Sequence, residues 1–418
     1  MSKETNKKLN NTEKDESVFT PQTFDSAMQT FAEQEIPPDI KKKRKGWLGT
    51  VLLFAVIAVS IWFVLQLATG MSDGLKSFDE VIANANVPFI FVTFGALILL
   101  YFIESSKYAT ILSVIDGKPR WKESIKVMFL GKYYDSITPF ASGGQAMQIH
   151  YLHKKGFSGG TSTAVIVIKF FSNMFVWLMV SLVFMIFNVD ALQSLGAETQ
   201  GVLIAGGWIG WAVNMLLPLF IVIFMFLPSV GTALVRGVVK LGAKLHIIKD
   251  EEKVKNKAFR VVKDFRAALS IMVRHPWRLL LLLLLCAIEV TAVFAFPYFV
   301  MRAYNGLTAA DGIGAMWDVI TLNIFATMSV TVMPTPGNSG FLETAITMAF
   351  SKIAQEVLLW VVLTWRGLVY YVYIIIGIGI TIFEVIRNSV NRRKERLCSN
   401  QTQTVAKQDN DVSQEKLE

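Results

Sequence analysis

Residues 331–343 read Thr-Val-Met-Pro-Thr-Pro-Gly-Asn-Ser-Gly-Phe-Leu-Glu, a polar interruption within a strongly apolar region. Proline removes a backbone donor and breaks the helical hydrogen-bond ladder, and glycine allows positive φ without steric cost. Inside a membrane, non-helical backbone is tolerated only where protein buries it or where it lines a wet cavity. We therefore interpret this segment as the tip of a re-entrant hairpin in an integral membrane protein.

The composition agrees with that interpretation. Of the 418 residues, 53% are hydrophobic, and they are concentrated in long runs. The net charge of +9 comes largely from basic residues beside these runs, where they act as topology signals and contact anionic membrane lipids. No nucleic-acid recognition motif accompanies the charge, so nucleic acid is not an expected partner. Two cysteines, Cys286 and Cys398, provide no disulfide framework.

The apolar runs predict about six full spans with both termini in the cytoplasm. The basic cluster at residues 41–45 precedes the first run, and arginines follow the last one. The predicted spans are residues 47–69, 88–105, 164–187, 202–227, 276–301 and 358–386. Lys107 and the basic residues after it are expected on the cytoplasmic side of the second span.

The remaining residues divide the chain into a membrane domain and two tails. Residues 1–45 and 391–418 are polar, and we expect disordered cytoplasmic tails there, the first ending in the basic cluster. Residues 46–390 are expected to form the transmembrane domain. Within it, residues 231–276 form a basic amphipathic connector that either lies on anionic lipid or shields the inner face of the bundle.

A second interrupted segment, residues 124–155, is too short and too polar to cross the membrane. It breaks at Pro139, followed by Gly143 and Gly144, whereas the first-named hairpin breaks at Pro336 and Gly337. Charge flanks place the two hairpins on opposite faces, and paired broken segments point to a midplane transport site. The predicted fold is an all-α integral membrane protein with two oppositely oriented re-entrant hairpins in an inverted-repeat-like arrangement. Two short spans over residues 312–355 are an alternative.

Each returning hairpin arm is expected to begin a half-helix near the bilayer centre. Ser142 and Gln145 have capping-box spacing, and Asn338 or Ser339 is expected to cap the second arm. Two helix N-termini that face one another would suit a phosphate group. The alternative is that each Pro-Gly cluster is only a structural kink.

Ionisable residues within the spans are candidate functional groups, because each costs roughly 2.5–3.5 kcal/mol at a helix centre on insertion scales. Arg366 lies in the last span with Tyr370 and Tyr373 on the same helix face. We expect Arg366 to pair with Glu343 or Glu289, or to face a lipid phosphate. A purely structural ion pair is the alternative.

Other charged residues lie in or near the predicted spans and hairpin arms. Asp135 and Asp318 lie in descending hairpin arms and are expected to line a polar cavity, and Lys169 lies a turn or two inside its span. Glu104 lies near a predicted span end, where snorkelling would explain it. His150 and His153 lack further ligands at metal-binding spacing, so no metal site is expected.

Three segments resemble the transmembrane domain of bacterial lysylphosphatidylglycerol synthases, the flippase-like domain of the multiple peptide resistance factor. They carry a Pro…Gly-Gly hairpin, a Pro-x-Pro-Gly-x-x-Gly-x-x-Glu hairpin, and an arginine followed by Tyr-Tyr in the last span. Here these are Pro139, Gly143 and Gly144; Pro334, Pro336, Gly337, Gly340 and Glu343; and Arg366, Tyr370 and Tyr371. The resemblance covers about residues 47–390. It departs at Gly337-Asn338, where the family usually has Gly-Gly.

The resemblance implies movement of a lipid, classically an aminoacylated phosphatidylglycerol, between leaflets of a bacterial plasma membrane. Full-length synthases add a soluble transferase domain, for which the residues after the last span are too few. We therefore expect a transporter without enzymatic activity, catalytic residues or cofactors. The expected substrate-binding residues are Asp135, Pro139, Gly143, Gly144, Gln145, Pro334, Pro336, Gly337, Asn338, Gly340, Glu343, Arg366 and Tyr370.

Two alternative functions stay open. One is a membrane enzyme that acts on lipids with Asp135 or His150, which requires titratable groups that converge. The other is a partner or regulator of a separate lipid or glycolipid synthase, acting through residues 231–276. Because no P-loop is present, transport would be passive or coupled to an ion gradient. The sequence leaves open which lipid is moved and whether the chain forms an oligomer.

Overall fold

The computed structural model describes residues 76–138, 143–226, 252, 270–333, 335–384 and 387. These residues contain helices and connecting loops, and no β-strand. The α-helices are α4 (Phe78–Ala83), α5 (Val87–Ile115), α6 (Trp121–Ile137), α7 (Gly143–Lys154), α8 (Gly159–Phe187), α9 (Ala197–Phe226), α12 (Pro276–Ala303), α13 (Gly314–Val330), α14 (Phe341–Phe350) and α15 (Leu358–Arg366). Short turns of 3₁₀-helix are η2 (Val189–Ser194), η3 (Ala309–Asp311), η4 (Pro336–Asn338) and η5 (Gln355–Val357), and η6 (Gly367–Tyr371) is a π-helix.

Five helical segments are long and apolar enough to cross a membrane. They are Val87–Ile115, Gly159–Phe187, Ala197–Phe220, Pro276–Ala303 and Gln355–Glu384. They coincide with five of the six predicted spans, and the predicted span 47–69 lies outside the described residues. Large apolar side chains on their outer faces, such as Phe91 and Phe187, are exposed, as expected for contact with lipid.

The second predicted span is longer than the sequence indicated. α5 continues ten residues past the predicted end at Ser105, to Ile115. The polar residues at that point do not end the helix because the protein satisfies them internally. Ser106 Oγ donates to the carbonyl of Phe102 (2.6 Å), and Lys107 is buried among acidic partners. The expectation that Lys107 lies on the cytoplasmic side of the span is therefore wrong.

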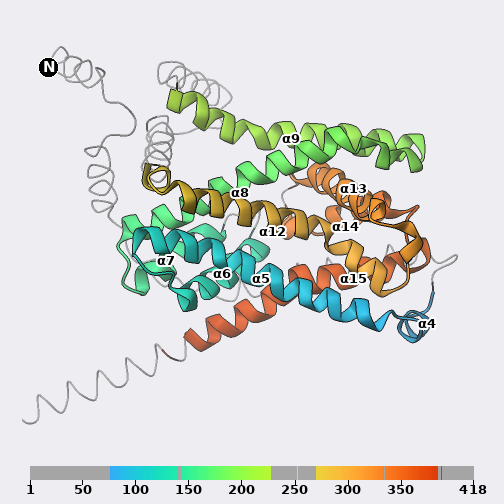
Figure 1. Cartoon of the computed structure of the whole chain (residues 1–418), viewed down its shortest axis with the longest axis horizontal. Coiled ribbons are helices and arrows are strands. Elements are labelled where there is room, and N and C mark those ends of the chain that lie inside the picture. The colour runs from blue at the N-terminus through green and yellow to red at the C-terminus, as the bar shows by residue number, and fades with distance from the viewer. Residues whose placement is uncertain are drawn as a thin grey trace, which may run out of the picture.

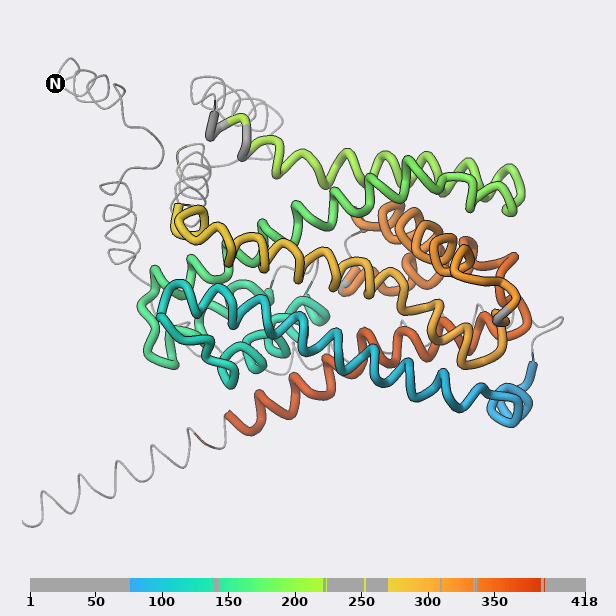
Figure 2. Tube along the Cα trace, viewed as in Figure 1, coloured from blue at the N-terminus to red at the C-terminus, as the bar shows by residue number. Residues whose placement is uncertain are grey.

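The long helices run back and forth along one direction (Figure 1). α5 runs from the end that carries α4 toward the end that carries α6 and α7, and α8, α9, α12 and α15 alternate in direction after it. This alternation agrees with the predicted topology. The tube view shows the two hairpins at opposite ends of this bundle, α6–α7 at one end and α13–α14 at the other (Figure 2).

The tips of the two hairpins meet inside the bundle. α6 packs against α7, α13 packs against α14, and the end of α6 contacts η4 at the tip of the second hairpin. The hydroxyl of Tyr370, in η6, donates to the carbonyl of Ser136 in α6 (2.8 Å). Segments more than two hundred residues apart thus join at one place.

Backbone conformation at the second tip explains its glycines. Gly337 has φ +58° and Gly340 has φ +89°, values that L side chains rarely adopt. Gly340 is the N-cap of α14, and its N–H donates to the carboxylate of Glu343 (2.7 Å). The expectation that Asn338 or Ser339 caps this arm is therefore wrong.

The first tip is held by side chains of the descending arm. The N–H of Gly143 donates to Thr138 Oγ1 (2.9 Å), and the N–H of Gly144 donates to Asp135 Oδ1 (2.9 Å). Ser142 lies outside the described residues. Like the N–H of Gly340, these two N–H groups are already hydrogen-bonded within the protein.

Two large hydrophobic clusters pack within the described part of the bundle, one around each hairpin. The larger packs α12, α13, α14 and α15 around Phe296, Phe325 and Phe350. The smaller packs α6, α7 and α8 around Tyr108 and Leu152. Glu384, at the end of the last span, accepts from Lys126 (3.3 Å) and Lys155 (3.2 Å) and so fastens that end to the first hairpin. The terminal tails and most of the predicted connector 231–276 lie outside the described residues.

Candidate functional site

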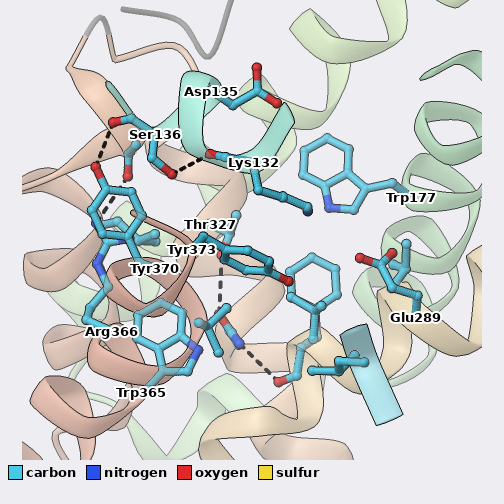
Figure 3. A pocket seen from close by; sticks show the side chains of 18 of the residues that line it. Lys132, Asp135, Ser136, Trp177, Glu289, Thr327, Trp365, Arg366, Tyr370 and Tyr373 are labelled. Carbon is cyan, nitrogen blue, oxygen red and sulfur yellow. Dashed lines mark hydrogen bonds between the residues drawn. The ribbon is translucent and has the colours of Figure 1, made fainter. Parts of the chain in front are cut away.

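A cavity of about 380 Å³ lies where the hairpin tips meet. Its volume falls within the roughly 300–1,000 Å³ of small-molecule sites. It is lined by Leu97, Leu100, Lys132, Asp135, Ser136, Asn173, Trp177, Glu289, Val290, Val293, Phe294, Asn323, Thr327, Gly337, Leu342, Trp365, Arg366, Val369, Tyr370 and Tyr373. Both hairpins and four of the spans contribute. Figure 3 shows Arg366 and Tyr370 on one side of the cavity and Glu289 on the other.

Arg366 is anchored on one side of this cavity. Its Nε donates to Glu343 Oε1 (2.6 Å), and its Nη2 donates to the carbonyl of Gly337 (3.1 Å). The guanidinium also stacks over the ring of Tyr370, 4.6 Å from its centroid. Glu343 is fully buried, and both of its oxygens accept bonds, one from Arg366 and one from Gly340. Arg366 therefore fastens the last span to the second tip and presents its remaining N–H groups at the cavity.

The first hairpin contributes one basic residue, Lys132, and one acidic residue, Asp135, to the cavity wall. They lie a helical turn apart on α6, and their side chains diverge in Figure 3. Neither forms an ion pair within the described part of the chain; Lys132 lies over the ring of Tyr373, 5.8 Å from its centroid. Lys132 is therefore a cation at the cavity without a protein counter-ion among these residues.

A buried ionic cluster forms part of the cavity wall opposite Arg366 and extends behind it. We call this cluster the quartet, and its members are Glu104, Lys107, Lys169 and Glu289. Lys107 contacts Glu104 closely and lies 3.3 Å from Glu289, and Lys169 lies 2.8 Å from Glu104. Lys107 also donates to Asn173 Oδ1 (2.7 Å). The quartet joins α5, α8 and α12, and Glu289 and Asn173 extend from it to the cavity wall.

The ion pairs of the quartet show that the expectation for Glu104 is wrong, and they decide which carboxylate pairs with Arg366. Glu104 does not snorkel, since it is 1% exposed and is paired with two lysines. Of the partners proposed for Arg366, the structure selects Glu343, whereas Glu289 pairs with Lys107. The predicted shared face of Arg366, Tyr370 and Tyr373 is confirmed, because all three line the cavity.

The predicted site residues divide into four groups. Asp135, Gly337, Arg366 and Tyr370 line the cavity. Gly143, Gly144, Gly340 and Glu343 lie directly behind it and shape the tips. Gln145 is exposed and Asn338 is half-buried, and neither lines the cavity; on α7 the buried glutamine is Gln148, which donates to the Tyr108 hydroxyl (2.7 Å). Pro139 and Pro334 lie outside the described residues, and Pro336 is described only as backbone in η4.

Several cavity residues were not singled out from the sequence. Asn173 lies one turn after Lys169 on α8, and Asn323 lies in the middle of α13, where its amide donates to the carbonyl of Phe294 (3.0 Å). A polar residue within an apolar helix is the signal that could have identified both. Trp365 Nε1 is a buried donor with no hydrogen-bond partner among the described residues.

Two further hollows lie toward the α4 end of the bundle. Asp318 lines both, and its carboxylate accepts from Asn188 (3.2 Å), so Asp318 does not reach the cavity between the tips. In the described part of the chain, no group of three or more His, Cys, Asp or Glu side chains gathers as metal ligands would.

Comparison with known proteins agrees with this architecture. A family model described as lysylphosphatidylglycerol synthase TM region matches residues 48–377. The chain belongs to this family. The lysylphosphatidylglycerol synthase transmembrane family and the long apolar helices together identify a multi-pass membrane protein.

One curated relative is a UPF0104 membrane protein of Methanocaldococcus jannaschii. It is 27% identical over 101 residues, which cover 24% of this chain and 30% of the relative. The aligned part is thus less than a third of that relative's length. No solved structure matches the chain significantly.

Proposed function

We propose that the protein is a lipid translocase, which moves a phosphate-bearing lipid head group between leaflets through the cavity between the hairpin tips. The observation that carries this proposal is the cavity itself, which both opposed hairpins line and whose wall contains Lys132 and Arg366. Broken helices at the interface of two repeats are the usual setting of a transport site. The family to which the chain belongs is compatible with this function.

The chemistry of the cavity wall favours an anionic head group. Arg366 has donors left after its bonds to Glu343 and Gly337, and Lys132 has no ion pair in the described residues. Trp365 Nε1 adds an unused donor. A phosphate would accept from such groups, while the acyl chains stay in lipid. An aminoacylated head group is compatible as well, because Asp135 on the same wall would attract its ammonium.

Movement between leaflets requires the meeting point of the tips to open. The hydrogen bond from Tyr370 to Ser136 and the contact between α6 and η4 close the cavity between the hairpins. Releasing these contacts alternately toward the two ends of the bundle would expose the head group first to one leaflet and then to the other. We propose transport without chemical modification of the lipid, so the protein is not assigned an enzymatic activity.

The proposed setting is a bacterial plasma membrane with both termini in the cytoplasm and with anionic lipids around the bundle. A separate synthase that supplies the lipid is a proposed partner. The described contacts favour the translocase over the enzyme and the regulator, because Asp135 lines the cavity and His150 does not, and most of the connector lies outside the described residues.

The decisive test is leaflet exposure of acyl-labelled phosphatidylglycerol in liposomes that contain the purified protein. We expect Lys132→Met to slow exposure roughly tenfold or more, because a hydrogen bond to a charged group contributes about 1.5–3 kcal/mol. Lys132 is the suitable position because it lines the cavity and forms no ion pair in the described residues. The matched control is Lys122→Met, which removes an exposed lysine from the first turn of the same helix. Equal rates in wild type and Lys132→Met, or no exposure by wild type, would contradict the proposal.

A further inference from the structure

Glu289 differs from the other members of the quartet in its access to the cavity. It lines the cavity wall, whereas Glu104, Lys107 and Lys169 do not. It is also the less firmly held carboxylate. Its ion pair with Lys107 is 3.3 Å long, whereas Glu104 contacts both Lys107 and Lys169. A carboxylate that meets a cavity from a buried ionic cluster can exchange a proton with water in that cavity.

Neutralising Glu289 would leave the cluster intact. Lys107 would keep its contact with Glu104 and its hydrogen bond to Asn173 Oδ1 (2.7 Å), so no ammonium would be stranded. Removing one partner of a buried pair is costly chiefly when the other charge is left uncompensated. Protonating Glu104 would instead deprive both lysines of a partner.

The charges around the cavity balance when it is empty. Four acidic and four basic side chains in the described residues line it or lie directly behind it: Glu104, Asp135, Glu289 and Glu343, and Lys107, Lys132, Lys169 and Arg366. A head group with one negative charge would leave this low-dielectric site with an excess of one. Like charges disfavour ionisation, so the anion would favour uptake of a proton by a cavity carboxylate.

We propose that Glu289 is the proton-exchange site through which the movement of each anionic head group is coupled to the uptake of one proton. This inference rests on the proposed translocase function. The proton passes from water in the cavity to the Glu289 carboxylate when the anion enters, and it returns to water when the anion leaves on the other side. The charged and titratable groups that face the quartet are Tyr108 on α5, Cys286 on α12, Tyr373 after η6, and Lys132 and Asp135 on α6.

This coupling predicts how unevenly the lipid is distributed between the leaflets at equilibrium. One proton moving with one singly charged anion is electroneutral, so a difference of one pH unit across the membrane would drive a tenfold difference in lipid between leaflets at equilibrium. The lipid would accumulate in the leaflet on the alkaline side. By linkage, binding of the anion would also strengthen as the pH falls, by up to tenfold per unit.

The test measures this final ratio in liposomes with acyl-labelled phosphatidylglycerol and a pH difference of one unit. We expect a ratio near ten for wild type and near one for Glu289→Gln, which keeps the shape of a protonated glutamate. Glu356→Gln is the matched control, because Glu356 forms an exposed pair with Lys76 far from the cavity. The final ratio does not depend on the rate of movement.

A second readout does not require movement. When short-chain phosphatidylglycerol is added in weak buffer, the detergent-purified wild type should take up about one proton for each lipid that it binds. The variant Glu289→Gln should take up none. A wild-type ratio of one with rapid lipid movement would overturn the coupling and leave the translocase in place. No movement and no binding by wild type would overturn both. A pH response that persists in Glu289→Gln but is lost in Asp135→Asn would overturn the assignment to Glu289.

Discussion

At the scale of single residues, the pairing of Arg366 and Glu343 decides how the second hairpin tip is fixed. Glu343 is fully buried, and its two oxygens receive donors from the guanidinium of Arg366 and from the N–H of Gly340. This carboxylate has no exposed surface and does not line the cavity. Its role is therefore to orient Arg366 and close the turn, while Arg366 alone meets the cavity.

We expect Glu343→Gln to destabilise the protein by about 3–5 kcal/mol, because the buried guanidinium loses its counter-ion. An amide also cannot accept from both donors at once, since one of its ends is itself a donor. Thermal unfolding in detergent would measure the loss. The double variant Glu343→Gln, Arg366→Gln should recover part of it, because the uncompensated charge is gone.

The control for this prediction is Glu356→Gln at the exposed pair with Lys76, where a loss of about 0–1 kcal/mol is expected. Similar losses at Glu343 and Glu356 would show that the buried pair is not a structural anchor. A double variant no more stable than Glu343→Gln would show that the charge of Arg366 is compensated in another way.

At the scale of elements, the tip of the second hairpin packs closely against the last span where Gly337 meets Tyr370. A side chain at Gly337 would overlap the ring of Tyr370, and Gly337 has φ +58°. The π-helix η6 follows directly after Arg366, and the hydroxyl of Tyr101 donates to its Leu368 carbonyl (3.2 Å). π-Helical turns often occur at functional sites. Here the turn carries Tyr370 toward both tips.

We expect Gly337→Ala to weaken lipid movement and to cost roughly 1–2 kcal/mol for the left-handed conformation, in addition to the displacement of Tyr370. Displacing that ring would break its bond to the Ser136 carbonyl. Gly95→Ala is the matched control, because Gly95 lies inside α5 with open space around it. There the change should be neutral or stabilise the protein by about 0.5–1 kcal/mol. Equal effects at both glycines would show that the contact with Tyr370 is unimportant.

Local signals explain what the sequence could predict about these elements. Proline and glycine mark a break wherever they occur in an apolar run, and basic flanks mark the side of the membrane. These signals were enough for five spans, for the helix breaks between α6 and α7 and between α13 and α14, and for the shared face of Arg366 and Tyr370. They were also enough to place Asp135 at a polar cavity.

Long-range partners explain what the sequence could not predict. Lys107 was taken for a loop residue because its partners Asn173 and Glu289 lie on other helices, far along the chain. Gln145 was singled out because capping-box spacing is a local signal, whereas the burial of Gln148 on α7 depends on packing against Tyr108. The choice between Glu343 and Glu289 for Arg366 likewise required the tertiary arrangement.

At the scale of the whole molecule, the alternating helices place two sets of loops at opposite ends. α9 and α15 begin at the end that carries α4, whereas α6 begins and α7 ends at the opposite end (Figure 1). The exposed residues Asp190 and Glu356 directly precede α9 and α15 in the chain, and the exposed residues Lys122 and Lys154 lie at the start of α6 and the end of α7. If the hairpins enter from opposite faces of a membrane, these two sets lie in different compartments.

Single cysteines introduced into a cysteine-free background would test that separation. We expect cysteines at positions 190 and 356 to react with an impermeant maleimide added to intact cells. Cysteines at positions 122 and 154 should react only after permeabilisation. Reaction of both sets from the same side would contradict the crossing topology. Reaction of positions 122 and 154 alone in intact cells would reverse the proposed orientation.

The contact between Tyr370 and Ser136 also has a consequence for biosynthesis. The two residues are separated by 234 positions. At translation rates of about 5–20 residues per second, the first hairpin emerges roughly 12–47 s before the residue that closes it. During that interval its polar tip, with Lys132 and Asp135, has no last span to pack against. An insertase or membrane chaperone that shelters this half-assembled hairpin would then determine how much of the newly made protein reaches the native state.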